Sequence, residues 1–176
     1  MPDSGSINPA KLNPVLAAIF SPANSAEENL KQLGIALPEA PIPAANYVPY
    51  AISGNLVFVS GQLPLVDGKL QMTGHVGENI SVEQAAGQAR LCAVNLLAQL
   101  KAACGGDLSR VKRVVKLGGF VACNSDFGNQ PEVMNGASDL MVEVFGDAGR
   151  HARFAVGTNA LPRGTVVEVE GLFEIS

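Results

Sequence analysis

The order of the elements that the sequence predicts indicates an α+β protein, a two-layer sandwich in which a mixed β-sheet packs on two helices. Three observations lead to this fold class. A chain of 176 residues that is 47% apolar has the length and composition of one domain with a sizeable core. Two segments carry apolar residues at helical spacing, and the segments around them alternate between apolar and polar residues as strands do. Helices kept apart from strands in this way are typical of the α+β class.

Residues 1–45 are predicted to form an N-terminal extension with short helices, and residues 46–176 the main domain. Asn13-Pro14 is a favourable start for a first short helix that reaches Phe20. Ser25-Ala-Glu-Glu28 has the spacing of a capping box, which predicts a second short helix. The prolines at positions 38, 41 and 43 then require an extended connection to the main domain.

The main domain is predicted to begin with a hairpin, whose strands cover 47–52 and 56–60 around a Ser-Gly-Asn turn. Another turn is expected at 66–69. A long strand is expected over 111–123, after the first helix of the domain. Gly118-Gly119 inside this strand indicates either a bulge or a close approach of another backbone segment.

Two amphipathic helices are predicted in the main domain. Ser81-Val-Glu-Gln84 is a capping box that opens the first, and Gly105-Gly106 ends it. The second starts near Pro131. The buried stripes, at i, i+3, i+4, i+7 spacing, are Val82, Ala85, Ala86, Ala89, Ala93, Leu96, Leu97 and Leu100 in the first helix, and Val133, Ala137, Leu140, Met141 and Val144 in the second.

The last part of the chain carries the polar side chains with the clearest chemical use. Two strands are predicted around a Leu161–Gly164 turn, and Arg153 opens the first of them. Glu168 and Glu170 lie two residues apart in the second, so they point to the same face. If the strands bring Arg153 and a glutamate face to face, the arginine can grip a carboxylate bidentately and the glutamate can activate a water molecule as a general base. The alternatives are an exposed ion pair and solvated surface carboxylates.

Charge and composition disfavour a nucleic-acid partner and favour association of the chain with itself. The net charge of -4 and the pI near 5.1 argue against nucleic acid, which normally requires a basic face. In the most basic run, the period of a strand places Lys112 and Lys116 on one face and Arg113 on the other, so no continuous cationic stripe is expected. Charged residues make up only 16% of the chain, and such a surface is expected to associate into a homo-oligomer.

No segment indicates secretion or membrane insertion, and a cytoplasmic location is expected. The apolar run at 15–20 is far too short to span a bilayer. Cys92, Cys104 and Cys123 show no CxxC spacing and are interpreted as buried thiols in a reducing compartment. His75 and His151 lie far apart and no Cys/His cluster or phosphate-binding glycine motif occurs, so the residues predict neither a metal site nor a phosphate-binding loop.

Ser60-Gly61-Gln62 ends the second strand of the predicted hairpin. A glycine at this place has two interpretations. It either ends the strand in an ordinary turn, or lets a ligand approach the backbone and contact its N–H and C=O groups. The residues alone leave both open.

Taken together, these motifs resemble the Rid/YjgF family of reactive-intermediate deaminases, whose members are also called endoribonuclease L-PSP or translation-initiation inhibitors. The similarity covers roughly residues 45–176, and the 45-residue extension resembles a longer subgroup. The resemblance is carried by Tyr47, by Gly54-Asn55 and the strand that leads to Ser60-Gly61-Gln62-Leu63-Pro64, and by Ala152-Arg153, Leu161-Pro162 and Val167-Glu168-Val169-Glu170.

The resemblance implies a fold like that of the small trimeric chorismate mutases, a homotrimer with ligand clefts between its subunits, and no cofactor. It also implies roles for residues that match the family motifs. Arg153 is the carboxylate-binding arginine and Glu168 the water-orienting glutamate, and Glu170 is left with a structural or supporting role. The expected substrate-binding residues are Tyr47, Ser60, Gly61 and Gln62, with Asn124 or Ser125 at the place of a family asparagine.

The activity that follows is hydrolytic deamination of small carboxylate-bearing enamines and imines, like 2-aminoacrylate, to 2-keto acids and ammonia. Two other functions stay open. The same cleft could bind keto acids without turnover, as a regulatory protein does. The older family names suggest an endoribonuclease or translation inhibitor, which the acidic pI disfavours. Chorismate mutase activity rests on analogy of fold alone, which is a poor guide to function.

Overall fold

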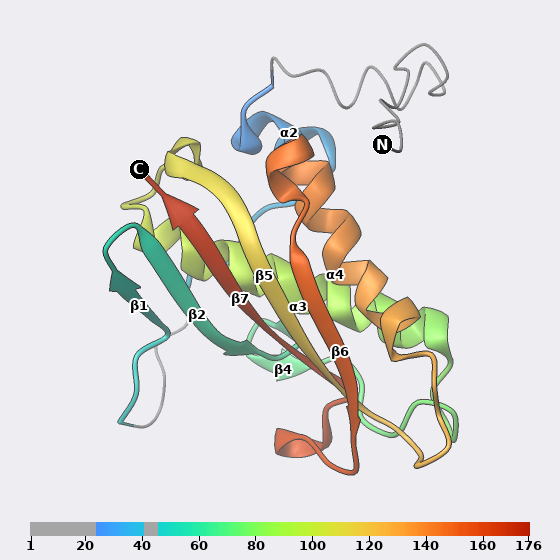
Figure 1. Cartoon of the computed structure of the whole chain (residues 1–176). Coiled ribbons are helices and arrows are strands. Elements are labelled where there is room, and N and C mark those ends of the chain that lie inside the picture. Colours follow the sequence, from blue (N-terminus) through green and yellow to red (C-terminus); the bar gives the residue numbers. More distant parts are fainter. Residues whose placement is uncertain (1–23, 41–45) are drawn as a thin grey trace, which may run out of the picture.

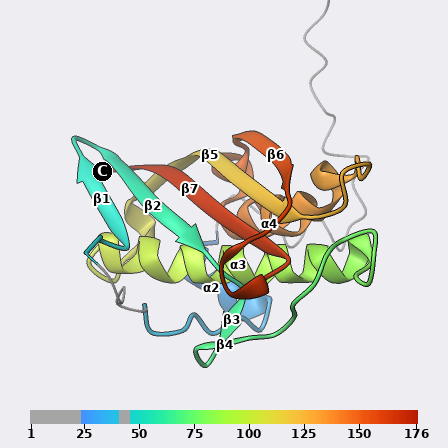
Figure 2. The same ribbon diagram turned by 90° about the horizontal axis from the view of Figure 1, so that it is seen from below.

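The computed structural model describes residues 24–40 and 46–176, and it has the predicted α+β architecture. A sheet forms one layer and the helices α3 and α4 the other, as Figure 1 shows from the side of the sheet and Figure 2 from below. The helix expected over 13–20 lies outside the described residues. The elements are α2 (Ala26–Gln32), β1 (Tyr50–Ser53), β2 (Leu56–Gln62), β3 (Leu65–Val66), β4 (Lys69–Leu70), α3 (Val82–Ala103), β5 (Val111–Ala122), α4 (Gln130–Phe145), β6 (Ala152–Thr158) and β7 (Val167–Ile175).

The main sheet is mixed, with the strand order β1-β2-β7-β5-β6. Only β5 and β6 run parallel, and α4 is the crossover between them. The turn expected at Leu161–Gly164 is present, as a single 3₁₀ turn over Pro162–Gly164. It does not join neighbouring strands, because β5 lies between β6 and β7. The turn therefore connects two strands that are not neighbours in the sheet, because the connection crosses over the end of β5.

Both predicted capping boxes form and fix the start of their helices. The Ser25 hydroxyl accepts from the Glu28 N–H (3.2 Å), and the Glu28 carboxylate accepts from the Ser25 N–H (2.8 Å). Ser81 and Gln84 repeat this arrangement at the start of α3. The side chain of Asn29 on α2 also donates to the Val144 carbonyl on α4 (2.9 Å), so α2 is attached to the helix layer of the domain.

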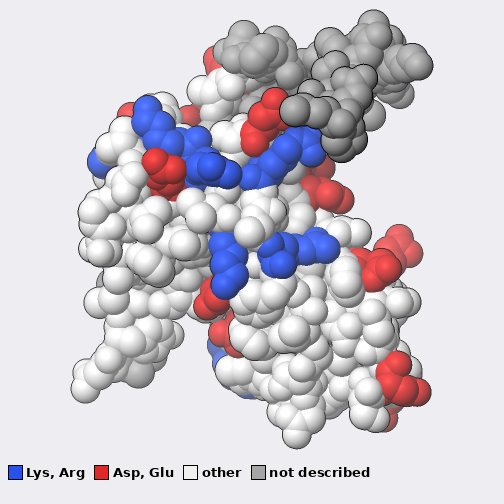
Figure 3. Space-filling model, viewed as in Figure 1, with Lys and Arg blue, Asp and Glu red and all other residues white. Residues whose placement is uncertain are grey.

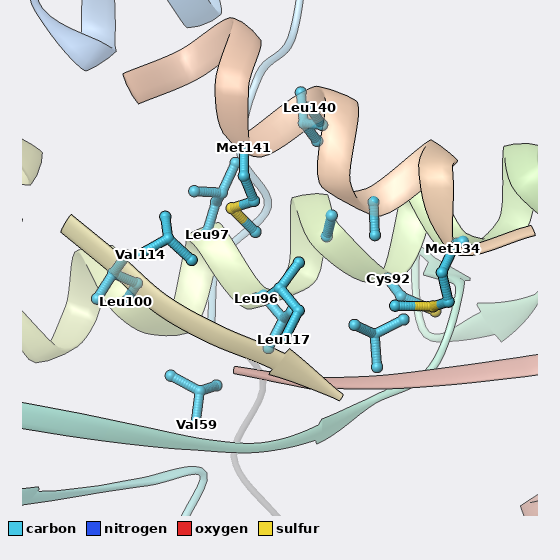
Figure 4. Packing of buried hydrophobic residues seen from close by; sticks show 14 of the residues in the cluster. Val59, Cys92, Leu96, Leu97, Leu100, Val114, Leu117, Met134, Leu140 and Met141 are labelled. Carbon is cyan, nitrogen blue, oxygen red and sulfur yellow. The ribbon is translucent and has the colours of Figure 1, made fainter. Parts of the chain in front are cut away.

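The core lies between the sheet and the two long helices (Figure 4). The predicted stripe of α4 and most of that of α3 face it, while Val82 is only partly buried and Ala86 lies outside the core. From α4, Leu140 and Met141 are fully buried; from α3, so are Leu96 and Leu97. The sheet contributes the alternate residues of β7, so that Val167, Val169 and Phe173 are buried while Glu168 and Glu170 face the other way. The three cysteines are buried and free, as the sequence predicted.

The glycine pair in β5 marks a close approach on both sides of the sheet. A Cβ at Gly118 would collide with the ring of Phe154, and one at Gly119 with the side chain of Met134 on α4. The irregularities in the pairing of β5 with β7 occur earlier in the strand, between Val111 and Lys116. The interpretation of Gly118-Gly119 as a bulge is therefore wrong, and the segments that approach these glycines closely do so with side chains and not with their backbone.

These irregularities also change the distribution of charge on β5. Arg113 pairs with Glu174 and Lys116 with Leu172, and both partners lie on the outward face of β7. The prediction that Arg113 and Lys116 occupy opposite faces is wrong, because extra residues in the pairing shift the alternation. Arg113 and Lys116 thus lie together on the open face of the sheet. Along 24–40 and 46–176, no helix is both long and apolar enough to cross a bilayer.

Two helical glycines give a matched pair of stability predictions. A Cβ at Gly136 on α4 would overlap the backbone carbonyl oxygen of Ala86 on α3, whereas Gly87 has open space around its Cβ position. Gly136→Ala is expected to lower the free energy of unfolding by about 1–3 kcal/mol, because the helices must separate. Gly87→Ala is expected to raise it by about 0.5–1 kcal/mol, because alanine favours the helix. Urea unfolding followed by circular dichroism measures both, and equal effects would contradict this packing.

Candidate functional site

One face of the sheet packs on helices, and the described chain leaves the other face open. Apolar side chains on the open face are strongly exposed: 48% for Phe58, 38% for Phe120 and 44% for Val156. Phe120 stacks edge-on against Phe154 with ring centres 5.4 Å apart, and the Lys116 Nζ lies 5.1 Å from the centre of the Phe154 ring. Figure 3 looks onto this face and shows Lys and Arg side chains across its middle, between broad uncharged areas.

Glu168 lies on this open face, at the end where β7 begins. It pairs with Phe120 across the sheet and is half-buried. Its carboxylate sits above Gly61 on β2, where any Cβ would overlap the Glu168 Oε1 atom. Burial raises the pKa of the Glu168 carboxyl, and the negative charge of Glu170 raises it further. Along 24–40 and 46–176, no side chain or backbone group forms a hydrogen bond or ion pair with this carboxylate.

Ser60 connects this region to the segment that carries Tyr47. The Ser60 hydroxyl donates to the Val48 carbonyl (2.9 Å), and the Ser60 N–H donates to the Pro49 carbonyl (2.9 Å). Tyr47 itself is 59% exposed. Gln62 donates its side-chain amide back to the Ser60 carbonyl (3.0 Å), which fixes the irregular end of β2. Tyr47 and Ser60-Gly61-Gln62 therefore belong to the same end of the sheet as Glu168.

Arg153 lies on the edge strand β6 and is directed to the other face. It pairs with the buried Leu117, so its side chain runs towards the helix layer. There its Nη1 donates to the Asn135 Oδ1 (2.9 Å) and to the Ser138 Oγ (3.1 Å), both on α4. His151, two residues earlier, lies beside them, with its Nε2 3.0 Å from the Ser138 Oγ.

Arg153 and Glu168 do not meet within one chain. They are separated by two strand spacings and three residues along the strands, which places their Cα atoms about 14 Å apart. Their side chains also leave the sheet on opposite faces, since Arg153 contacts α4 and Glu168 faces outward. A single chain therefore offers two half-sites: an acidic one at Glu168 and Gly61, and a basic one at the β6 edge.

Asn124 and Ser125 are not brought to Arg153 either. They follow β5 at the end of the sheet where the Cys123 N–H donates to the Thr158 carbonyl. This is about 20 Å along the strands from Arg153. Asn135 is the asparagine that contacts the arginine, and sequence reasoning missed it. Its spacing of three from Ser138 on one side of α4 was the signal that could have found both.

Two further features lie away from these half-sites. An open groove of about 490 Å³ runs between α2, residues 35–39 and α3, and its polar lining consists of the side chains of Glu27, Lys31, Glu39 and Lys101. Over the residues with described positions, no three His, Cys, Asp or Glu side chains come close enough together to hold a metal ion.

A mixed five-stranded sheet with two helices on one face and an open second face defines a chorismate-mutase-like α+β protein. The comparison with protein families agrees with this class. The family model described as "YjgF/chorismate_mutase-like, putative endoribonuclease" matches residues 27–174, and the chain belongs to this family.

Individual relatives are also similar along most of their length. The protein TCP17 of Trypanosoma cruzi is 51% identical over 149 residues, which are 84% of this chain and 92% of TCP17. A protein of unknown function from Agrobacterium tumefaciens is 53% identical with a TM-score of 0.81, covering 86% of this chain and 92% of that one. A Shewanella oneidensis protein with the endoribonuclease label is 37% identical with a TM-score of 0.83, covering 86% of this chain and all of that one (100%).

Proposed function

We propose that this protein hydrolyses small imines that bear a carboxylate, such as the imine formed from 2-aminoacrylate, to a 2-keto acid and ammonia. The observation that carries the proposal is the state of Glu168. Its carboxyl is half-buried, its pKa is raised by burial, and it has no partner among the described residues. A carboxylate of this kind is suited to accept a proton from water, because its pKa lies closer to neutrality than that of an exposed glutamate.

The basic half-site supports a substrate with a carboxylate. Arg153 uses only Nη1 in its contacts with described residues, and the side chain is exposed at the sheet edge. Its Nε and Nη2 donors form the fork that matches the two oxygens of a carboxylate. A 2-imino acid carries such a carboxylate directly beside the carbon that water attacks.

The proposed reaction needs only water and the two half-sites. Glu168 accepts a proton from water as the oxygen bonds to the carbon of the protonated imine, and the C=N electron pair moves to the nitrogen, which gives a carbinolamine. The protonated Glu168 then gives its proton to the nitrogen. As the C–N bond breaks and the C=O bond of the keto acid forms, Glu168 accepts the hydroxyl proton and passes it to the departing ammonia, which leaves as ammonium. The backbone at Gly61 and the hydroxyl of Tyr47 are proposed to orient the substrate. Holding water and imine together supplies the acceleration.

Assembly of several copies is part of the proposal. The apolar open face and the unpaired β6 edge are surfaces that favour association. If the edge of one subunit lies against the open face of another, Arg153 of one chain approaches Glu168 of the next. A homotrimer with three such clefts is the proposed arrangement. The three free buried thiols agree with a cytoplasmic location, which is also proposed.

Imine hydrolysis is the decisive test. The imine is generated continuously by an amino-acid oxidase or a PLP-dependent lyase, and keto-acid release is measured above the spontaneous rate. Arg153→Ala is expected to lower kcat/KM by about 100-fold or more, because the carboxylate loses its anchor. The matched control is Arg150→Ala, whose arginine is exposed and pairs with Asp147 at 3.2 Å; it is expected to retain full activity. Wild-type protein that does not exceed the spontaneous rate would refute the proposal.

Keto-acid binding without catalysis is the closest rival. In that case wild type binds pyruvate through Arg153 but leaves the imine half-life unchanged, and Glu168→Gln has no effect on affinity.

An RNA-cleaving function has one observation in its favour, the cations Arg113 and Lys116 on the same open face. It would require RNA affinity that falls steeply with salt.

A further inference from the structure

The contacts of Arg153 continue beyond α4 into a chain of hydrogen bonds that ends on the backbone. Arg153 Nη1 donates to the Ser138 Oγ at 3.1 Å. The Ser138 Oγ lies 3.0 Å from the His151 Nε2, and the His151 Nδ1 lies 2.6 Å from the Gly149 carbonyl oxygen. The half-buried imidazole therefore lies between the arginine's serine partner and the turn before β6.

The chemistry of these groups fixes the direction of every bond. A carbonyl oxygen only accepts, so the His151 Nδ1 must carry the proton that goes to Gly149. In a neutral ring the Nε2 is then an acceptor, and the Ser138 hydroxyl donates a hydrogen bond to it. The serine oxygen is left with lone pairs for Arg153. Burial and the nearby Arg153 charge lower the pKa of His151, which keeps the ring in this neutral form.

We propose that Ser138 and His151 are positioning residues that hold the Arg153 guanidinium in its carboxylate-binding orientation. This inference rests on the proposed function. Asn135 and Ser138 hold the same nitrogen, Nη1, from two sides. The guanidinium plane is thus fixed with its Nε and Nη2 edge directed away from α4. A mobile, exposed arginine loses much rotamer freedom when it binds a ligand, and this loss weakens binding. An arginine that is already held in place does not lose this freedom on binding.

This assignment differs from a purely structural role. If these hydrogen bonds served only to attach β6 to α4, breaking them would lower the stability of the protein. That effect would be the same whether or not Arg153 is present. If they orient Arg153, their loss weakens carboxylate binding and has no further effect once Arg153 is absent. The two roles therefore predict different double-mutant cycles.

Two substitutions, Ser138→Ala and His151→Leu, remove hydrogen bonds from this chain of contacts. A third, His151→Gln, can still donate to Gly149 and accept from Ser138. In the full-length protein, the first two are expected to raise the pyruvate Kd and the imine KM about tenfold with little change in kcat, because ground-state binding is lost. His151→Gln is expected to restore values near wild type. In an Arg153→Ala background, Ser138→Ala and His151→Leu are expected to cause no further change.

Nitrogen-15 NMR tests the arrangement without any ligand or activity. Wild-type His151 is expected to carry its proton on Nδ1 at neutral pH, and the Arg153 guanidinium to rotate slowly about its Nε–Cζ bond. Ser138→Ala is expected to abolish the slow rotation. A proton on Nε2, free rotation in wild type, or an equal loss of affinity in the Arg153→Ala background would overturn the inference. Wild type that shows this signature and binds pyruvate but hydrolyses no imine would refute only the deaminase function.

Discussion

A mixture of Arg153→Ala and Glu168→Gln subunits is expected to regain activity that neither variant has alone. The two residues leave opposite faces of the sheet, about 14 Å apart at their Cα atoms, so a cleft containing both must draw them from two chains. In a randomly mixed assembly each cleft receives an intact arginine with a chance of one half, and independently an intact glutamate with the same chance. About a quarter of the clefts are therefore complete.

The measurement is imine hydrolysis after the two variants are unfolded and refolded together, compared with each refolded alone. Arg153→Ala mixed with the double variant Arg153→Ala/Glu168→Gln is the control, because no cleft in that mixture contains an arginine. Native mass spectrometry establishes that subunits have exchanged. If exchanged subunits show no recovered activity, the shared cleft is wrong, because a site within one chain cannot be restored in this way.

Glu168→Gln is expected to stabilise the folded protein at neutral pH while removing activity. Burial and the charge of Glu170 raise the pKa of the Glu168 carboxyl above its unfolded value. The folded state is then penalised for holding the ionised form, and the penalty develops as the pH rises through the folded pKa. It is absent below the unfolded pKa, about 4.3 for glutamate. The glutamine variant should therefore unfold at a higher temperature at pH 7, and the difference should vanish as the pH falls towards about 4.

The pH dependence of catalysis follows from the same carboxyl. Glu168 must be ionised to accept a proton from water, so the acid limb of the rate profile should lie above the ordinary range of a glutamate. Glu170→Gln is the matched control on the same face of β7. It should retain catalysis and move the acid limb to lower pH, because the charge of Glu170 contributes to the raised pKa of Glu168. A Glu168→Gln protein that is less stable than wild type at pH 7 would contradict this account.

The helices and most strands could be predicted from the sequence because their signals are local. Capping boxes at Ser25 and Ser81 act within a single turn, and the apolar stripes of α3 and α4 follow from the period of a helix. The alternation of Val167 and Val169 with Glu168 and Glu170 likewise follows from the period of a strand. The family motifs at Ser60-Gly61-Gln62 and Arg153 indicate the same α+β fold as these patterns.

The order of the strands could not be predicted in the same way. A turn at Pro162–Gly164 suggested neighbouring strands, but the pairing of the long β5 with β7 places β5 between β6 and β7. The side of the sheet on which Arg113 lies also depends on irregular pairing in β5, which strict alternation cannot anticipate. Such features arise from contacts between segments far apart in the chain.

By itself, the sequence determined the α+β class, the elements, and the two residues on which the proposed chemistry depends. Only the tertiary structure decided that Arg153 and Glu168 belong to different half-sites, because the side chain of a strand residue is assigned a face only once its partners are known. The tertiary structure also placed Asn135 of α4 beside the arginine and linked Arg153 through Ser138 to His151. Those contacts join α4 to the edge strand β6. No local pattern in the sequence of either segment shows that the two come together.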